Sequence, residues 1–184
     1  MNRPSRWHVE RLESLADYRV FSVSALHARR DRDGHAYTFF RIEASDWVNV
    51  VALTEHDEFV LVRQFRLGSG TETLEIPGGV VDPGETPQRT AERELLEETG
   101  YVAEHWQAIG RVNPNPALHG NALHTFLARG CRKVAEIVND HAEETIVELV
   151  PRSRLQERVA AGEVDHALVL AALYWLAAHE AGGG

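Results

Sequence analysis

The sequence is poor in cysteine, with Cys131 as the single example among 184 residues. One cysteine cannot close an internal disulfide or provide a cysteine zinc cluster, which excludes disulfide-stapled scaffolds and cysteine-based zinc modules. We expect Cys131 to be a small buried hydrophobe beside a strand. A chain of this length does not need disulfides or a zinc cluster for stability, because it can bury a full hydrophobic core as one domain.

Long apolar runs are also missing. No stretch is long enough to cross a bilayer, and the N-terminal segment MNRPSRWHVERLESL lacks the apolar core of a signal peptide. These observations favour a cytoplasmic protein without a membrane partner. Internal repeats, low-complexity tracts and linkers are not seen either, so we expect a single domain over residues 1–184.

Positive charge is scarce. The chain has 19 Lys and Arg against 28 Asp and Glu, a formal net charge of −9. Affinity for nucleic acids comes mostly from clustered Lys and Arg, so the composition argues against a general nucleic-acid binder. An anionic substrate would need a metal ion and locally placed arginines to overcome the negative field of this protein.

Hydrophobic periodicity predicts a strand-rich chain. Residues 1–17 are interpreted as a polar lead-in with one tryptophan, and Asp31-Arg32-Asp33-Gly34 is a hairpin turn signal. The apolar run WVNVVALT predicts a buried central strand. Strands are expected at residues 18–29, 36–43, 47–54, 59–65, 73–77, 105–112, 122–128 and 144–150.

Two helices are expected near the C-terminus. Ser153-Arg154-Leu155-Gln156 has the form of a capping box that opens a helix to about residue 161. Asp165 is the expected cap of a long apolar helix over residues 167–178. Strands combined with one interior helix and terminal helices predict an α+β fold, a mixed sheet with helices on both faces.

The most informative stretch is residues 78–101, GGVVDPGETPQRTAERELLEETGY. It consists of a glycine-rich loop followed by an acidic helix. Thr86 is a suitable N-cap, and Pro87 stands at the first helical position, where a missing N–H costs least. Gly100 is suited to end the helix, because glycine adopts positive φ readily.

Within this helix Glu94, Glu97 and Glu98 lie on one face, because their offsets are three and four residues. Like charges at this spacing oppose a helix by roughly 0.2–0.5 kcal/mol per pair. The cluster is therefore either a solvated acidic face or a metal site. Carboxylates, backbone carbonyls and waters are the ligands of Mg²⁺ or Mn²⁺, and a Gly-Gly turn lets backbone approach a metal or phosphate closely.

The spacing of these residues resembles the Nudix box. One position departs from the pattern, since Tyr101 stands where an aliphatic residue is preferred, and we interpret this as a packing variation. The fixed positions of the signature are filled by Gly79, Glu85, Arg93, Glu94, Leu95, Glu97, Glu98 and Gly100.

The resemblance implies a metal-dependent hydrolase that cleaves a nucleoside diphosphate linked to another group. It implies that Glu94 and Glu98 bridge the metal ions, which are Mg²⁺ or Mn²⁺. Glu97 is implied as a third ligand and the carbonyl of Gly78 as a further one. The implied fold is a mixed sheet sandwiched between helices in α/β/α layers.

Other positions acquire roles from the same resemblance. Arg93 is expected to pair with Glu85 and pin the loop to the helix, while Leu95 and Ala91 pack on the sheet. For the general base, Glu144 is our first choice and Glu143 the second. The alternative is that both residues simply precede a strand.

The segment FVLVRQFRLGSGTETLEIPGG resembles the ADP-ribose and nucleoside-diphosphate-sugar pyrophosphatase branch of the family. Arg66 would clamp a phosphate and Glu75 would bind metal or substrate, unless both only form a strand ion pair. Pro116, fifteen residues beyond Tyr101, is typical of the ADP-ribose branch. The Asn-Pro-Asn-Pro form of the loop departs from the glycine-rich version and leaves other nucleotide sugars open.

The same branch implies a homodimer, with residues 1–45 as an N-terminal antiparallel hairpin that takes part in dimerisation and residues 46–184 as the catalytic core. Trp47 and Trp7 are candidates for stacking a base, or for packing. Two other functions remain open. One is hydrolysis of dinucleoside polyphosphates or clearance of other nucleotides, and the other is a ligand-sensing module without catalysis.

Overall fold

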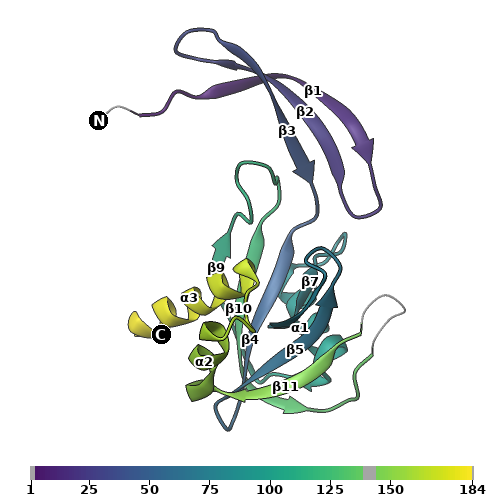
Figure 1. The fold of residues 1–184 in the computed structure, drawn as a ribbon, viewed down its shortest axis with the longest axis vertical. Helices are drawn as coiled ribbons and strands as arrows, with labels where there is room; N and C mark the ends of the chain where they lie inside the picture. Colours follow the sequence, from purple (N-terminus) through teal and green to yellow (C-terminus); the bar gives the residue numbers. More distant parts are fainter. Residues whose placement is uncertain (1–2, 139–143, 184) are drawn as a thin grey trace. The chain divides into compact units, whose positions relative to one another are not determined.

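The structure is a computed structural model that describes residues 3–138 and 144–183. It contains a small antiparallel sheet, a larger mixed sheet and helices on the latter (Figure 1). The elements in chain order are β1 (Trp7–Asp17), β2 (Ser22–Arg30), β3 (Ala36–Glu43), β4 (Trp47–Thr54), β5 (Glu58–Arg66), β6 (Thr71–Glu75), β7 (Gly78–Val80), α1 (Pro87–Thr99), β8 (Tyr101–Val102), β9 (His105–Val112), β10 (Leu123–Lys133), β11 (Ile146–Pro151), η1 (Arg152–Arg154), α2 (Leu155–Ala160) and α3 (Ala167–Ala181).

Contacts between Cα atoms divide the chain into two compact units. The N-terminal unit consists of Met1–Ser45 and Asn113–Ala122, and the core unit consists of Asp46–Val112 and Leu123–Gly184. The expected boundary after residue 45 coincides with an edge of the N-terminal unit. The segment Asn113–Ala122, which the sequence analysis assigned to the catalytic core, groups with that unit instead.

The N-terminal unit is a three-stranded antiparallel sheet in the order β1-β2-β3. The predicted hairpin turn is present, with Gly34 at φ 70° and the amide of Arg30 bonded to the carbonyl of His35 at 2.9 Å. The segment Asn113–Ala122 joins this sheet at Ile42, whose amide donates to the carbonyl of Leu118 at 2.8 Å.

The sequence analysis assigned no strand to residues 1–17 and so missed the first strand. Trp7–Asp17 is a long edge strand that pairs with β2 from Trp7 opposite Arg30 to Asp17 opposite Ser22. Most of its residues are exposed, so the sequence has no buried face from which a two-residue period would arise. The predicted start of β2 at residue 18 was also early, because residues 18–21 form the turn between the two strands.

The core unit contains the predicted mixed sheet, in the order β11-β5-β4-β10-β8. Strands β4 and β10 run parallel, whereas the other pairs are antiparallel. Short strands that the sequence analysis did not anticipate, β7 and β8, pair with β4 and β10. The strand β4 lies at the centre and is buried on both faces, which explains its near-continuous apolar sequence.

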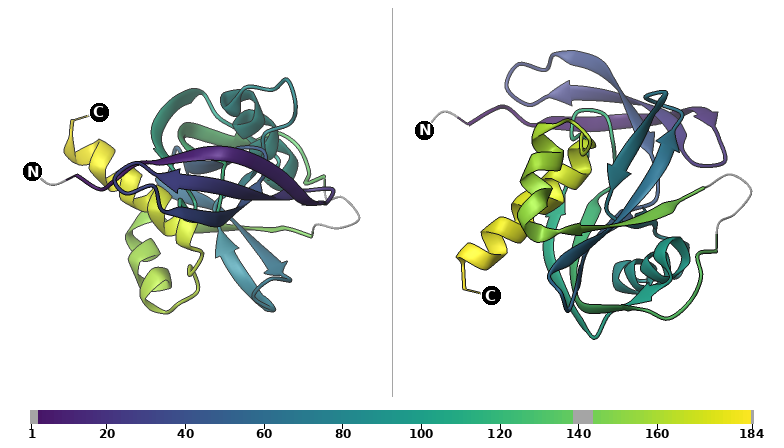
Figure 2. Two further views of the ribbon diagram at one scale, coloured as in Figure 1. Left: turned by 90° about the horizontal axis from the view of Figure 1, so that it is seen from above. Right: turned by 60° about the horizontal axis from the view of Figure 1, so that its bottom comes forward.

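Successive residues of β4 lie on opposite faces of the sheet and contact different helices. Val50 belongs to a buried cluster with Ala91 and Leu95 of α1, as predicted. Val51 belongs to a second cluster with Leu155 of α2 and apolar residues of α3. Helices therefore cover both faces of the sheet, with α1 on one side and α2 and α3 on the other (Figure 2).

Two predicted helix caps were wrong. The expected capping box at Ser153 does not form, because residues 152–154 are a 3₁₀ turn and Arg154 precedes α2 without a side-chain cap bond. The N-cap of α3 is His166 rather than Asp165. His166 is the last residue with extended backbone, and its Nδ1 accepts the amide of Leu168 at 3.2 Å, as a Ser or Asp oxygen would.

Cys131 is buried in β10, as predicted. Its burial raises the pKa of the Cys131 thiol to about 11, so the thiol stays protonated and unreactive near neutral pH. Among the residues that the structure describes, no helix is long and apolar enough to span a membrane.

The packing of α1 leads to a stability prediction. Leu95 is fully buried against the sheet, whereas the next residue, Leu96, is 37% exposed. Leu95→Ala should lower the free energy of unfolding by about 2–5 kcal/mol, because it leaves a cavity between helix and sheet. The matched control Leu96→Ala should cost less than about 1 kcal/mol. Urea unfolding measures both variants, and equal midpoints would show that α1 does not pack through Leu95.

Candidate active site

The helix α1 is fixed at both ends by local interactions that its sequence predicts. Thr86 is the N-cap, and its hydroxyl accepts the amide of Arg89 at 3.3 Å. Gly100 has φ 75° and donates its amide to the carbonyl of Leu96 at 2.8 Å. A Cβ at Gly100 would lie 2.0 Å from the carbonyl oxygen of Ala135, so glycine is required there by space as well as by conformation.

Two carboxylates of α1 meet the backbone of the glycine loop. The amide of Gly78 donates to Glu98 Oε2 at 2.9 Å. A Cβ at Gly79 would lie only 2.1 Å from Glu94 Oε1, so the Glu94 carboxylate occupies the space that any side chain at this position would need. Glu98 is buried, whereas the side chain of Glu97 is 48% exposed. The loop and the helix therefore approach each other only because the loop has no side chains here.

The other side of the loop is equally close to the sheet. Gly78 pairs with Asn49 of β4, and a Cβ at Gly78 would lie 2.4 Å from the carbonyl oxygen of Val48. The loop backbone is thus held between the central strand and the carboxylate face of α1.

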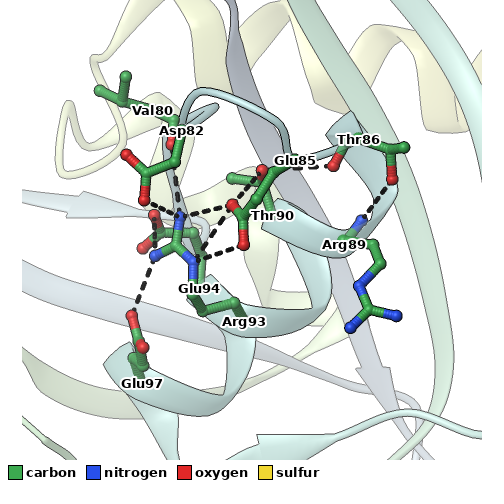
Figure 3. A network of polar contacts seen from close by, with 9 residues as sticks. All are labelled: Val80, Asp82, Glu85, Thr86, Arg89, Thr90, Arg93, Glu94 and Glu97. Atoms are coloured by element: carbon green, nitrogen blue, oxygen red, sulfur yellow. Dashed lines mark hydrogen bonds and ion pairs between the residues drawn. The ribbon is translucent and has the colours of Figure 1, made fainter.

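Arg93 lies at the centre of a network of acidic side chains (Figure 3). The expected pair with Glu85 is present at 3.2 Å, and Thr90 donates to the same carboxylate at 2.8 Å. The sequence analysis did not anticipate that Arg93 also pairs with Glu94 at 2.9 Å and with Glu97 at 3.0 Å. The guanidinium therefore offsets the repulsion within the acidic face as well as fixing the loop.

The network shifts the pKa values of its members. Burial alone would favour a neutral Arg93, but the carboxylates of Glu85, Glu94 and Glu97 outweigh it and raise the pKa of Arg93. Conversely, the hydrogen bonds from Arg93 and Thr90 hold the pKa of Glu85 below its ordinary value. Both partners of the pair are therefore charged over the whole physiological range.

The donor set at this place fits a hard divalent cation. Glu94 and Glu98 both reach the Gly78–Gly79 backbone, so two carboxylates lie beside one loop, and carboxylate oxygens are ligands that Mg²⁺ prefers. Within residues 3–138 and 144–183, however, no three acidic, histidine or cysteine side chains form a ready cation cluster. In this structure the positive charge beside Glu94 and Glu97 is that of Arg93.

A cavity of about 340 Å³ opens beside the glycine loop, and we name it the β4–α3 cavity. Gly78, Gly79 and Glu98 form one part of its lining. Apolar residues form much of the rest, and polar side chains from β4, β5, β6 and the start of α3 complete it. The polar and aromatic side chains among its lining residues are Trp47, Asn49, Arg66, Glu75, Glu98 and His166.

Arg66 and Glu75 form a bidentate pair across β5 and β6, with two N–O distances of 2.9 Å. Thr73 donates to the same carboxylate at 2.6 Å. Although burial favours the neutral acid, these hydrogen bonds outweigh it and hold the pKa of Glu75 below its ordinary value. The sequence left open whether Arg66 and Glu75 bind a ligand or only form a strand ion pair. The two interpretations are compatible, because the residues form the ion pair and also line the cavity.

Arg63, three residues earlier on β5, is directed elsewhere. It pairs with Glu148 of β11 at 2.7 Å and with Glu163 at 3.5 Å, and Arg158 pairs with the same two carboxylates at 2.6 Å each. This four-membered network ties the turn after α2 to the sheet. The amide of Leu74 bonds to the carbonyl of Glu163 at 3.1 Å and fixes the same turn to β6.

The predicted base, Glu144, is exposed and does not line the β4–α3 cavity. It lines a neighbouring hollow of about 570 Å³, together with Arg63 and Arg66. The next residue, Thr145, is buried and donates to the backbone carbonyl of Glu98 at 3.1 Å, which brings this segment to the last turn of α1. The second choice, Glu143, lies outside the described residues.

Pro116 belongs to the N-terminal unit. Its loop is a compact turn, in which the carbonyl of Asn115 accepts the amides of Leu118 at 3.0 Å and His119 at 2.7 Å. The contact of Pro116 with substrate stays a prediction.

Sequence reasoning missed three residues near the site. Asn49 lines the cavity and carried a signal, because it is the one amide side chain inside an apolar strand. The sequence analysis overlooked His166 because it assigned the cap of α3 to the neighbouring residue, Asp165. The contact of Thr145 with α1 depends on tertiary structure alone.

Comparison with known protein families matches residues 46–173 to the NUDIX domain. An ADP-ribose pyrophosphatase of Mycobacterium tuberculosis is 30% identical over 175 residues, which cover 89% of this chain and 84% of that protein. An ADP-ribose pyrophosphatase of Bacillus subtilis is 36% identical over 103 residues, but the match spans only 55% of its length.

The fold has a counterpart among solved structures. A crystal structure of an ADP compounds hydrolase superposes with a TM-score of 0.85 over 100% of this chain and 99% of that one, at 20% sequence identity. Nudix hydrolases generally depend on divalent metal ions, in agreement with the carboxylate oxygens that α1 presents beside the glycine loop. The family match over most of the chain, with the box residues gathered on α1 and its preceding loop, shows that the chain belongs to the Nudix family of hydrolases.

Proposed function

We propose that this protein hydrolyses the pyrophosphate bond of nucleoside diphosphate sugars such as ADP-ribose, releasing a nucleoside monophosphate and a sugar phosphate. The observation that carries the proposal is the position of the acidic face. Glu98 of α1 lines the same cavity as the Arg66–Glu75 pair, so the residues proposed below for binding metal and phosphate border one space. The names of the relatives from Mycobacterium tuberculosis and Bacillus subtilis agree with this substrate class.

The physical difficulty of the reaction is negative charge, because the diphosphate repels both the attacking water and the acidic protein. We propose Glu94, Glu98 and the carbonyl of Gly78 as ligands of Mg²⁺, with Glu97 as a further ligand and Mn²⁺ as an alternative ion. When bound, such an ion neutralises charge on the diphosphate and makes a coordinated water more acidic. Arg93 holds Glu94 and Glu97 in place through its ion pairs with both before the substrate arrives.

Arg66 is proposed to bind a phosphate of the substrate. Its side chain is 43% exposed, whereas that of its partner Glu75 is 4% exposed. The buried carboxylate therefore fixes the plane of the guanidinium, and the arginine is the member of the pair that a ligand meets. A planar guanidinium held in this way loses little entropy when it binds a phosphate.

Glu144 is proposed as the general base, since Thr145 attaches its segment to the last turn of α1. A positioned base contributes roughly 10²–10⁴-fold to the rate. Glu143 is the second choice. We also propose that the enzyme works in the cytoplasm, where a chain with one buried thiol needs no oxidising compartment.

A homodimer is proposed from the surface of the N-terminal unit. Trp7, Tyr37 and Phe39 form an aromatic cluster, with ring centroids 5.0 and 4.9 Å apart for the two pairs with Phe39. A monomer seldom exposes so many large apolar side chains on one small sheet. The exposed ones are Val9, Leu12, Leu15, Tyr18, Val20, Phe21, Tyr37, Phe39 and Phe40.

The proposed reaction is tested with a substrate panel in the presence of Mg²⁺ and with product identification by mass spectrometry. The panel contains ADP-ribose, ADP-glucose, GDP-mannose, UDP-glucose, diadenosine tetraphosphate and nucleoside triphosphates. Glu98→Gln should reduce kcat by more than about 100-fold, since even a residue behind a metal ligand contributes about 10–100-fold. The control is Glu92→Gln, an exposed residue of the same helix, which should retain full activity.

Cleavage of polyphosphates alone would contradict the proposed substrate class and favour a dinucleoside polyphosphate or nucleotide-clearing enzyme. Binding of a nucleotide sugar by folded protein without any metal-dependent turnover would instead favour a sensing module.

The close approach of loop and helix gives a second prediction. Gly79→Ala should lower kcat/KM by at least about tenfold, because its Cβ would displace the Glu94 carboxylate by 1 Å or so, and misplacement on this scale can cost about 100-fold. Gly68→Ala is the control, since a Cβ at Gly68 meets nothing within 4 Å. Steady-state kinetics at saturating Mg²⁺ compares the two. Equal losses in both variants would show that the Gly79 contact is irrelevant to activity.

The proposed dimer is tested by size-exclusion chromatography with light scattering. The wild type should have twice the 20.6 kDa mass of one chain at micromolar concentration. The double substitution Tyr37→Ser and Phe39→Ser should shift the mass toward one chain, because it removes aromatic surface from the sheet. Tyr174→Ser, a change of an exposed aromatic in α3, should leave the dimer intact. A wild-type protein that is monomeric would refute the proposal.

A further inference from the structure

The lining of the β4–α3 cavity contains two polar side chains that the proposed reaction does not use. They are Asn49 of β4 and His166, the cap of α3. Both are oriented by the backbone of one residue, Leu168. The amide of Leu168 donates to His166 Nδ1 at 3.2 Å, and its carbonyl accepts from Asn49 Nδ2 at 3.1 Å.

These bonds determine which atoms are left for a ligand. Because Nδ1 of His166 accepts a hydrogen bond from the amide of Leu168, the neutral ring carries its proton on Nε2 and is a donor there. One N–H of Asn49 Nδ2 is used by Leu168, so the acceptor Oδ1 and the second N–H of Nδ2 are left. Asn49 is 6% exposed, and its Oδ1 is buried with no hydrogen-bond partner among the described residues.

This part of the lining is not suited to a phosphate. The amides at the start of α3 are already bonded, since those of Val169 and Leu170 reach the carbonyl of His166 at 3.0 and 3.1 Å. An anion would also meet the acceptor of Asn49 and the carboxylate of Glu75, which is close enough to His166 to interact with it electrostatically. A hydroxyl group fits better, because it accepts from His166 Nε2–H and donates to an acceptor such as Asn49 or Glu75.

We propose that His166, with Asn49 beside it, recognises a sugar hydroxyl of the substrate and is a specificity-determining residue. This inference rests on the proposed function, since it concerns the substrate of that same site. The hydroxyl belongs either to the ribose of the nucleoside or to the second sugar. Recognition by a polar pair held in place on a buried wall discriminates strongly against an analogue that lacks the hydroxyl.

The test uses a variant that separates recognition from capping. Asparagine is one of the best N-cap residues, so His166→Asn keeps an acceptor for the amide of Leu168 but removes the Nε2–H donor. The matched control is His179→Asn, in the last turn of the same helix. Thermal unfolding checks that both variants are folded, and His166→Asp, also a capping residue, replaces His166→Asn if that variant is not.

The substrates are ADP-ribose, its analogue with a 2′-deoxynucleoside, its analogue with a deoxygenated second ribose, and ADP-glucose. For ADP-ribose, His166→Asn should raise KM about tenfold with kcat within about twofold of wild type. The wild type should disfavour one of the deoxy analogues by a similar factor, and His166→Asn should abolish that preference, because the two changes remove the same hydrogen bond. The analogue that behaves in this way identifies the sugar.

Unchanged preference for every analogue in folded His166→Asn, or an equal effect of His179→Asn, would overturn the inference while the proposed function stands. If the wild type cleaves no nucleotide sugar, the proposed function fails. Calorimetric binding of the same panel to Glu98→Gln protein, with and without the His166 substitution, then tests the recognition of the hydroxyl by itself. Equal affinities of the two proteins for every analogue would overturn it.

Discussion

The structure depends on the close approach between the Gly78–Gly79 backbone and the carboxylates of α1. On one side the loop pairs with β4, and on the other it meets Glu94 and Glu98. No side chain fits on either glycine, because a Cβ would lie 2.4 Å from Val48 or 2.1 Å from Glu94. The absence of side chains at Gly78 and Gly79 is therefore required both for the packing of α1 on the sheet and for the position of its acidic face.

An acidic face at this distance from a backbone is unfavourable unless its charge is offset. Arg93 provides the offset, since it pairs with Glu85 of the loop and with Glu94 and Glu97 of the helix. It thus joins the loop to the helix and offsets the negative charge of the acidic face. A lysine would carry the same charge, but its single ammonium lacks the planar fork that reaches several carboxylates at once.

The rest of the lining of the β4–α3 cavity comes from segments that are distant in the sequence. Asn49 lies on the central strand, the Arg66–Glu75 pair spans β5 and β6, and His166 begins α3. The ion network of Arg63 and Arg158 with Glu148 and Glu163 fixes the turn before His166 to the sheet. The acidic part of the cavity lining is therefore local in sequence, while the other polar side chains are brought together by the fold.

The sequence by itself determined the family, the helix α1 with its caps Thr86 and Gly100, and the buried strand β4. These features are local, because a capping bond, a positive φ and a run of apolar residues each depend on only a few neighbouring residues in the sequence. Tertiary structure alone decided that Trp7–Asp17 is a strand and that His166 caps α3 and lines the cavity. An exposed edge strand forms through its partner rather than through its own pattern, and a side chain has a place in a site only once distant segments meet.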